Sequence, residues 1–409
     1  MKLDIDFVRA QFPAFSEPSL AGQAFFENAG GSYACAPVID RLNRFYRERK
    51  IQPYGAHDAP RLGGEEMDEA RARMAALLGV ETEELSFGPS TTQNTYVLAQ
   101  AFRQWMSPGE AIVVTNQDHE ANTGPWRRLA ADGIEIREWR VDPETGHLDP
   151  EKLEDLLDEK VRLVCFPHCS NVVGEINPVM EITAMSHAAG AFVCVDGVSY
   201  APHGFPDVGA LGPDIYLFSA YKTYGPHQGL MVMRRSLGEL LPNQGHYFNA
   251  DTLYMRFTPA GPDHAQVAAS AGMADYVDLL CDHHGGPGAE AGAVKRGAFV
   301  HDLMRGQEIA LLQPLLDAVK ERNAVRLLGP EKAELRAPTV ALSINADPAD
   351  VSAKLASRGI IANGGDFYAN RVLEAMGIDP GIGVLRVSFT HYTSKAEVDK
   401  LLNALDDLI

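Results

Sequence analysis

The chain has 409 residues, of which 45% are hydrophobic and 22% charged, and its formal net charge at pH 7 is −19. This is the composition of a globular protein with enough apolar material for a large core, and the length favours two domains. The strong negative charge argues against nucleic acid or an anionic membrane surface as a partner.

Targeting signals and cysteine usage favour the cytoplasm. The first residues carry no apolar segment of the signal-peptide kind, and no apolar run approaches the roughly 20 residues that span a membrane. An odd number of cysteines without a signal peptide fits a reducing compartment. No CxxC pattern occurs among the five cysteines, which are Cys35, Cys165, Cys169, Cys194 and Cys281. We expect Cys165 and Cys194, which lie in apolar runs, to be buried free thiols.

The N-terminal part is mainly helical by its pattern. Helices are predicted over residues 3–12, 37–49 and 64–78. A short apolar stretch, residues 25–28, is followed by Ala29-Gly-Gly31. The two glycines allow either an ordinary turn or a close approach of the backbone to a ligand.

Strands and helices then alternate up to about residue 230. Apolar runs predict strands over residues 85–88, 111–115, 133–140, 161–166, 191–195 and 214–218. Helices are predicted over 95–105, from about Pro125 onward, over 150–158 and over about 178–189. This alternation predicts an α/β domain with a mostly parallel, doubly wound sheet.

Polar side chains follow the ends of five of these strands: Thr91, His119, Asn171, Asp196 and Lys222. Each has an ordinary alternative, such as helix capping by the hydroxyls or a solvated loop histidine. Ligands of open α/β sheets bind at the carboxyl ends of the strands. Together these residues therefore predict a cofactor site.

Lys222 and Asp196 are the most informative of the five. Lys222 follows the buried run 214–218, where desolvation would lower the pKa of its amine and make it a nucleophile or base. The alternative is a surface lysine entering the turn Gly225-Pro226. Asp196 directly follows five apolar residues, and a carboxylate is almost never buried without a partner. Its alternative is a cap before Gly197.

The character of the sequence changes beyond residue 250. Asp282, His283 and His284 lie in a glycine-rich break, but adjacent histidines without a third ligand are poor support for a metal, and we expect none. A smaller α+β domain is predicted from a helical stretch over 293–321, strands over 339–344 and 383–389, and helices over 348–357 and 395–408. We expect a large domain over 20–280 and a small domain formed by 1–19 and 281–409.

The stretch Ser219-Ala-Tyr-Lys-Thr-Tyr-Gly-Pro226 closely resembles the pyridoxal-phosphate lysine motif of class V aminotransferases, the group that includes cysteine desulfurases and selenocysteine lyase-like enzymes. The resemblance covers most of the chain and includes, in the family's order, Thr91-Thr92, Asp118-His119-Glu-Ala-Asn122, Ser170–Gly174 with Asn177-Pro178, Val195-Asp-Gly197 and Arg386–Phe389. It implies a fold-type I enzyme with a large, mostly parallel sheet of the seven-stranded type and a smaller α+β domain. It also implies bound pyridoxal 5'-phosphate and a homodimer.

The resemblance also implies roles for single residues. Lys222 resembles the cofactor-binding lysine and base, Asp196 the partner of the pyridinium nitrogen, and His119 the ring stacked on the cofactor. Asn171 resembles a contact to the phenolic oxygen or to substrate, and Arg386 the clamp for the substrate carboxylate. Phosphate ligands are implied at Thr91, Thr92, Ser199, Ser219 and Tyr221, and further substrate contacts at Asn28, Gly30 and Tyr368.

Three departures from the family pattern stand out. Tyr221 replaces the histidine that precedes the lysine in desulfurases, and a tyrosine can still donate to phosphate. The loop over 363–370 has no cysteine to take up sulfur as a persulfide, and Tyr368 or a neighbour holds that place. Gly261 stands where a threonine of the partner subunit is expected, with His264 as a candidate substitute.

These observations predict an enzyme that acts on an α-amino acid. Lys222 removes the Cα proton, after which three outcomes are open: loss of a β-substituent, transamination, or epimerisation. We favour a C–S lyase for a cysteine-like substrate without a persulfide, and keep an aminotransferase or an epimerase as alternatives. A non-catalytic protein that binds the cofactor or a partner is the remaining hypothesis, and the joint presence of Lys222, Asp196, His119 and Arg386 argues against it.

Overall fold

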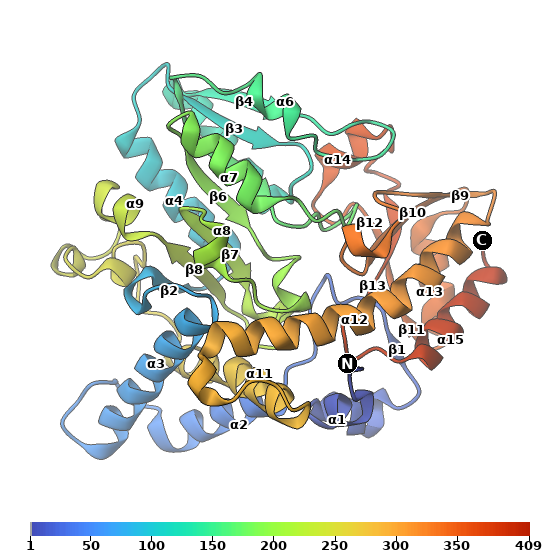
Figure 1. Ribbon diagram of the computed structural model, residues 1–409, viewed down its shortest axis with the longest axis horizontal. Helices are drawn as coiled ribbons and strands as arrows, with labels where there is room; N and C mark the ends of the chain where they lie inside the picture. Colours follow the sequence, from blue (N-terminus) through green and yellow to red (C-terminus); the bar gives the residue numbers. More distant parts are fainter. Residues whose placement is uncertain (1) are drawn as a thin grey trace.

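The computed structural model describes residues 2–409. Its larger part is built on a seven-stranded sheet (Figure 1). The strand order is β2 (Leu85–Gly88), β8 (Gly229–Met233), β7 (Ile215–Ser219), β6 (Phe192–Asp196), β5 (Val161–Pro167), β3 (Ala111–Thr115) and β4 (Glu135–Trp139). Only β8 runs antiparallel to its neighbours, so the expectation of a mostly parallel sheet is confirmed.

The central strands are apolar along their whole length because helices cover both faces of the sheet. Successive side chains of a strand point to opposite faces. In β5, Val164 and Phe166 accordingly join the core on one face, whereas Leu163 and Cys165 join the core on the other. This double burial explains why these strands read as continuous apolar runs rather than alternating ones.

Helices of the N-terminal and central parts are α1 (Ile5–Ala10), α2 (Ala36–Arg44), α3 (Asp58–Leu77), α4 (Thr91–Trp105), α5 (Glu120–Arg127), α6 (Glu151–Glu154), α7 (Val179–Ala188), α8 (Val208–Leu211), α9 (Arg235–Leu240), α10 (His264–Ala269) and α11 (Ala271–His283). The predicted start of α5 at Pro125 is wrong. His119 caps this helix, with Nδ1 accepting from Ala121 N at 3.0 Å, and Pro125 lies inside it.

The C-terminal part is a second layered unit. Its antiparallel sheet has the order β12 (Asn363–Gly365), β13 (Val384–Ser388), β10 (Thr339–Ile344) and β9 (Val325–Leu327). Its helices are α13 (Pro348–Ser357), α14 (Asn370–Ala375) and α15 (Lys395–Asp406). The N-terminal strand β1 (Ala24–Phe25) pairs in parallel with β11 (Ile360–Ile361), so the start of the chain contributes to this unit.

One long helix connects the two parts. In Figure 1, α12 (Ala293–Lys320) runs from beside α11 toward α13 and α15. Val300 and Leu303 near its start pack into the core of the large sheet, whereas Leu312 and Leu316 pack into the C-terminal core. The proposed division near residue 280 stays a prediction.

The histidines that raised the question of a metal have structural partners. His283 stacks on Phe7 with ring centroids 3.6 Å apart and pairs with Asp4 at 2.9 Å, and His284 Nε2 accepts from Asp4 N at 2.9 Å. They therefore tie α1 to α11. Within residues 2–409, no helix is long and apolar enough to cross a membrane.

Candidate active site

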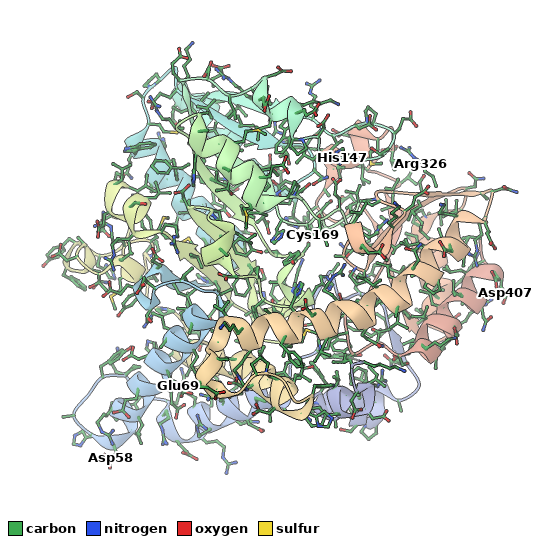
Figure 2. The ribbon with its side chains drawn as sticks, viewed as in Figure 1. Asp58, Glu69, His147, Cys169, Arg326 and Asp407 are labelled. Carbon is green, nitrogen blue, oxygen red and sulfur yellow. The ribbon has the colours of Figure 1, made fainter. Side chains whose placement is uncertain are left out.

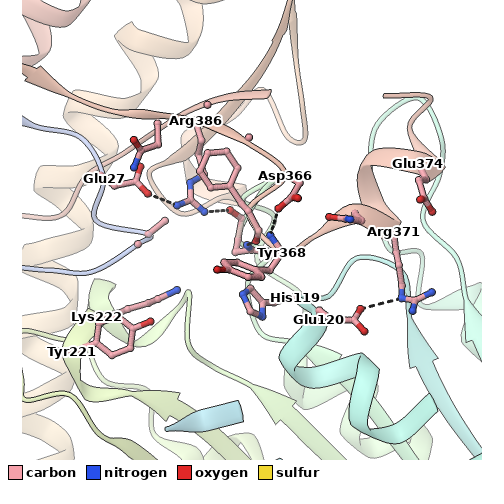
Figure 3. Close-up of a pocket in the computed structure, with 18 residues that line it drawn as sticks. Glu27, His119, Glu120, Tyr221, Lys222, Asp366, Tyr368, Arg371, Glu374 and Arg386 are labelled. Atoms are coloured by element: carbon pink, nitrogen blue, oxygen red, sulfur yellow. Dashed lines mark hydrogen bonds and ion pairs between the residues drawn. The ribbon is translucent and has the colours of Figure 1, made fainter. Parts of the chain in front are cut away.

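The predicted site residues gather at the carboxyl edge of the large sheet. An inner cavity of about 320 Å³ is lined by Thr91, Thr92, His119, Asn171, Asp196, Ser199, Ser219, Tyr221 and Lys222, together with Ser90, Asp118, Cys169 and His227 among others. It adjoins an outer cavity of about 950 Å³, which shares His119, Asn171, Tyr221 and Lys222 and is closed on its far side by the C-terminal unit (Figure 3). A site is thus formed where sheet edge and C-terminal sheet meet.

Lys222 is poised as a nucleophilic amine. It ends the turn that follows β7, and only 8% of it is exposed. Burial, and then the positive charge of Arg386, lower the pKa of its amine to about 8. Figure 3 shows the side chain pointing into the cavity beside Tyr221. About a fifth of the amine is therefore neutral near physiological pH, far more than for an ordinary lysine.

Asp196 is a buried carboxylate at the end of β6. Its Oδ1 accepts a hydrogen bond from Val198 N at 2.8 Å. Burial raises its pKa to about 6, and the nearby Lys222 opposes this rise. Burial and the repulsion of Asp196 also raise the pKa of Asp118, whose Oδ2 accepts from Asn122 at 3.0 Å. A cation placed against Asp196 would favour its charged form.

Hydroxyl groups line the opposite end of the inner cavity. Thr91 begins α4, and its Oγ1 lies 2.8 Å from Ser219 Oγ at the end of β7. Ser90 caps the helix by accepting from Gln93 N at 3.1 Å. Hydroxyls at the N-terminus of a 15-residue helix form a suitable cradle for a phosphate. The capping and anion-binding interpretations are therefore compatible here.

Tyr221 has a partner that the sequence did not reveal. Its ring stacks on His227, with centroids 4.9 Å apart and planes 12° from parallel. Both side chains line the inner cavity. Gly31 lies against the Tyr221 ring, since a Cβ there would lie 3.4 Å from it, at van der Waals contact distance. His227 is therefore a further candidate site residue, in the same cavity as the hydroxyl groups of Thr91 and Ser219.

His119 lies between the inner cavity and the C-terminal loop. Burial, followed by the charges of Lys222 and Arg386, lowers its pKa to about 3, so the imidazole is neutral. Since Nδ1 accepts from Ala121 N, the proton resides on Nε2. The ring faces Tyr368, with centroids 5.4 Å apart and an angle of 39° between the planes.

The loop after β12 is fixed to the large sheet. Asn171 Nδ2 donates to the carbonyl of Phe367 at 2.9 Å, and Glu120 N donates to the carbonyl of Tyr368 at 2.8 Å. Phe367 and Tyr368 adopt positive φ angles of 53° and 57°. Two successive non-glycine residues in this region are strained, and the hydrogen bonds hold them there. Tyr368 is 72% exposed and forms the outer wall of the cavity.

Arg386 lies on β13 with only 3% exposed, so its side chain faces inward. Nη2 forms an ion pair with Glu27 at 2.7 Å, and Nη1 donates to the Asn171 carbonyl at 3.1 Å. Its guanidinium lies 3.8 Å from the centre of the Phe367 ring. An arginine in this apolar strand could have faced solvent, but the structure places it on the inner face, where a guanidinium can bind a carboxylate.

Asn28 lies apart from the two cavities. Its Nδ2 donates to Ser388 O at 3.3 Å, and its Oδ1 accepts from Tyr392. It lines a separate small pocket beneath Lys222, whereas Glu27, Ala29 and Gly30 line the outer cavity. Its role as a substrate contact stays a prediction.

All five cysteines are buried and free. Cys169 lines the inner cavity but is only 2% exposed, and burial raises the pKa of its thiol to about 12. Figure 2 shows it in the interior of the molecule. The loop that closes the outer cavity carries Tyr368 and no cysteine.

A buried lysine and aspartate at the strand ends, beside a hydroxyl-lined helix start, define a cofactor-dependent α/β enzyme. The family model described as "Aminotransferase class-V" matches residues 24–256 and 298–401. The chain is 31% identical to an aminotransferase-like protein, FGM3, of Gibberella zeae, over 98% of both chains. It is 30% identical to a cysteine desulfurase of Serratia proteamaculans, over 99% of this chain and 98% of that one.

The chain therefore belongs to the class V aminotransferase family. Solved structures support the fold. A cysteine desulfurase from Thermococcus onnurineus has a TM-score of 0.85 at 23% identity, covering 100% of this chain and 98% of that chain. The cysteine desulfurase CsdA from Escherichia coli has a TM-score of 0.82 at 24% identity, with the same coverage. The protein is a pyridoxal 5'-phosphate enzyme, as the resemblance implied.

The inner cavity fits this cofactor on its own chemistry. It combines a neutral-prone amine at Lys222, a buried carboxylate at Asp196 that would gain from a cation, and a hydroxyl cradle at a helix start. Asn171 Oδ1 and Asp118 Oδ1 are buried without a hydrogen-bond partner among residues 2–409. An aldehyde, a ring nitrogen and a phosphate are complementary to these groups.

Proposed function

We propose that the protein is a C–S lyase that releases sulfur from a cysteine-like amino acid directly, without a persulfide on the enzyme. The observation that carries this proposal is the loop over residues 363–370, which closes the outer cavity with Tyr368 and has no cysteine. Cys169 lines the inner cavity, but its thiol is buried and protonated. No thiolate of this chain is therefore in a position to take up sulfur.

Pyridoxal 5'-phosphate, when bound, supplies an aldehyde for the amino group and a ring that withdraws electrons from Cα. In the proposal, Lys222 would bind the cofactor and then move the Cα proton, Asp196 would hold the ring nitrogen in its protonated form, and His119 would cover one ring face. The residues that would hold the phosphate are Thr91, Thr92, Ser199, Ser219 and Tyr221. Asn171 contacts the phenolic oxygen or the substrate.

On the substrate side, Arg386 receives the α-carboxylate and Tyr368 limits the cavity around the side chain. For L-cysteine, the Cα proton passes to Lys222, the Cβ–S bond breaks, and its electron pair leaves with sulfur as hydrogen sulfide. Hydrolysis of the remaining fragment gives pyruvate and ammonia, which balances the reaction with one water. A cytoplasmic homodimer is part of the proposal and is supported by the family.

An aminotransferase is the second candidate, because an outer cavity of about 950 Å³ admits a larger side chain and one relative is named aminotransferase-like. An epimerase remains a further alternative.

The test gives the cofactor-loaded protein L-cysteine, L-cystine and a panel of other L-amino acids. Pyruvate and ammonia in repeated turnovers, with no sulfur added to the intact protein mass, support the lyase. If instead one equivalent of keto acid forms per active site, and further conversion requires a second keto acid, the protein is an aminotransferase and not a lyase. Lys222→Ala is the control, and unchanged conversion by it would rule out both.

A further inference from the structure

Arg386, the proposed carboxylate receptor, is already engaged by a carboxylate of this chain. Glu27 Oε1 lies 2.7 Å from Arg386 Nη2, although the two residues are 359 positions apart in the sequence. Figure 3 shows Glu27 beside Arg386 on the wall of the outer cavity that lies above Lys222. Both residues line that cavity. The pair therefore lies inside the site rather than behind it.

The ion pair is incomplete. Glu27 uses one oxygen, and Glu27 Oε2 and Arg386 Nε are both buried without a hydrogen-bond partner among residues 2–409. Arginine–carboxylate pairs frequently form two parallel hydrogen bonds, and this pair forms one. Arg386 thus keeps hydrogen-bonding capacity that no protein group fills.

The backbone of Glu27 is held by hydrogen bonds, whereas its carboxylate has a single partner in the described part of the chain, Arg386. Its carbonyl accepts from Gly30 N at 2.9 Å and Gly31 N at 3.3 Å, and its backbone pairs with Ser388. A Cβ at Gly30 would lie 2.7 Å from Glu27 Oε1, the atom that contacts Arg386. Glycine at position 30 therefore leaves the space that the Glu27 carboxylate occupies.

We propose that Glu27 is a specificity-determining residue that occupies the carboxylate position on Arg386 and must be displaced by an incoming carboxylate. The inference rests on the proposed function for the assignment of Arg386 to the substrate carboxylate. Two carboxylates on one guanidinium repel each other, so a ligand that brings only a negative charge gains little at this site. A zwitterionic amino acid brings an ammonium group as well, which can pair with the displaced Glu27. The Glu27–Arg386 pair therefore favours the binding of amino acids over that of carboxylic acids without an amino group.

The test compares a carboxylate with its neutral amide. Dissociation constants of 3-phenylpropionate and 3-phenylpropionamide are measured by ligand-observed NMR on the cofactor-loaded protein. In the wild type, we expect the two constants to lie within threefold of each other. In Glu27→Gln, the constant for the carboxylate falls at least tenfold and that for the amide stays within twofold. Glu27→Asp keeps the charge and stays near the wild type. An unchanged or weaker carboxylate affinity in a folded Glu27→Gln variant overturns the inference.

A second variant tests the same point without changing any charge. Gly30→Ala pushes the Glu27 carboxylate off Arg386, so the affinity for 3-phenylpropionate should rise at least threefold. An unchanged affinity would overturn the inference, and this test holds even if Glu27→Gln fails to fold. In a double variant, Arg386→Lys should remove the gain in carboxylate affinity that Glu27→Gln produces. A gain that persists in the double variant does not arise from Arg386 and overturns the inference. Because binding is measured without turnover, loss of the lyase assignment would not mask either result.

Discussion

The lowered pKa of Lys222 predicts how the protein takes up its cofactor. Only a neutral amine attacks an aldehyde, so the rate of cofactor uptake by cofactor-free protein should rise with pH and level off above the pKa of Lys222. That pKa is lowered from 10.5 to about 8 by burial first and by Arg386 second. The lower pKa means that the protein destabilises the charged amine by about 3 kcal/mol relative to the neutral one. Because Lys222 is buried, solvent screens little of this free energy.

The magnitude is large enough for a direct measurement. At pH 7.5, about a quarter of an amine with a pKa of about 8 is neutral, against about one in a thousand for an ordinary lysine with a pKa of 10.5. Uptake near neutral pH should therefore be roughly 200-fold faster than for an exposed lysine. The assay follows the visible band of the lysine-bound cofactor after mixing, from pH 6 to 10.

The control is Arg386→Leu, which removes a positive charge near the amine. The pKa of Lys222 should rise, and the midpoint of the uptake profile should move to higher pH. A wild-type rate that still rises about tenfold per pH unit at pH 10, without levelling off, would refute the reasoning, because it would mean that the lysine is solvated. A midpoint near 8 that does not respond to Arg386→Leu would leave burial as the only cause.

Three further predictions concern other parts of the site and core. Asp196→Asn should still take up cofactor, with its visible band, but turn over about 100-fold more slowly or worse, because it loses the charge that the proposal places against the ring nitrogen; near-normal turnover would contradict this assignment. Ser219→Ala removes the hydroxyl 2.8 Å from Thr91 Oγ1 and should weaken cofactor affinity about tenfold in a fluorescence titration, whereas an unchanged affinity would place the phosphate elsewhere. Arg336→Met leaves buried carbonyls without donors and should lower the free energy of unfolding in urea by about 3 kcal/mol; a loss well under 1 kcal/mol would mean that the core repacks around the gap.

The sequence predicted the inner cavity well because of a general property of parallel sheets. The carboxyl ends of parallel strands lie on one edge, so His119, Asn171, Asp196 and Lys222 had to be neighbours once their strands were recognised. Thr91 joined them because β2 is parallel to β7, through the antiparallel β8 between them. Buried apolar runs, each followed by a polar residue, were therefore sufficient to predict which residues line the inner cavity.

The outer cavity was less predictable because its contacts join distant segments. Glu27 gave no local signal, and its contact with Arg386 depends on the pairing of β1 with β11 and on the bridge to Ser388. The stacking of His227 on Tyr221 follows from the path of a turn rather than from a pattern of residues. The start of α5 was missed because a histidine served as its cap and Pro125 was read as a first-turn residue.

The pairing of β1 with β11 has a consequence for the order in which the protein matures during synthesis. The residues of the inner cavity lie between positions 90 and 227, so this cavity is encoded in the first part of the message. Residues 24 and 25 must wait for residues 360 and 361, which at roughly 5–20 residues per second is a delay of roughly 20–70 seconds. The segment that lines the inner cavity is therefore synthesised well before the segment that pairs with β1. Cofactor supply and proteolysis of the unpaired N-terminus during that interval both bear on the yield of active enzyme.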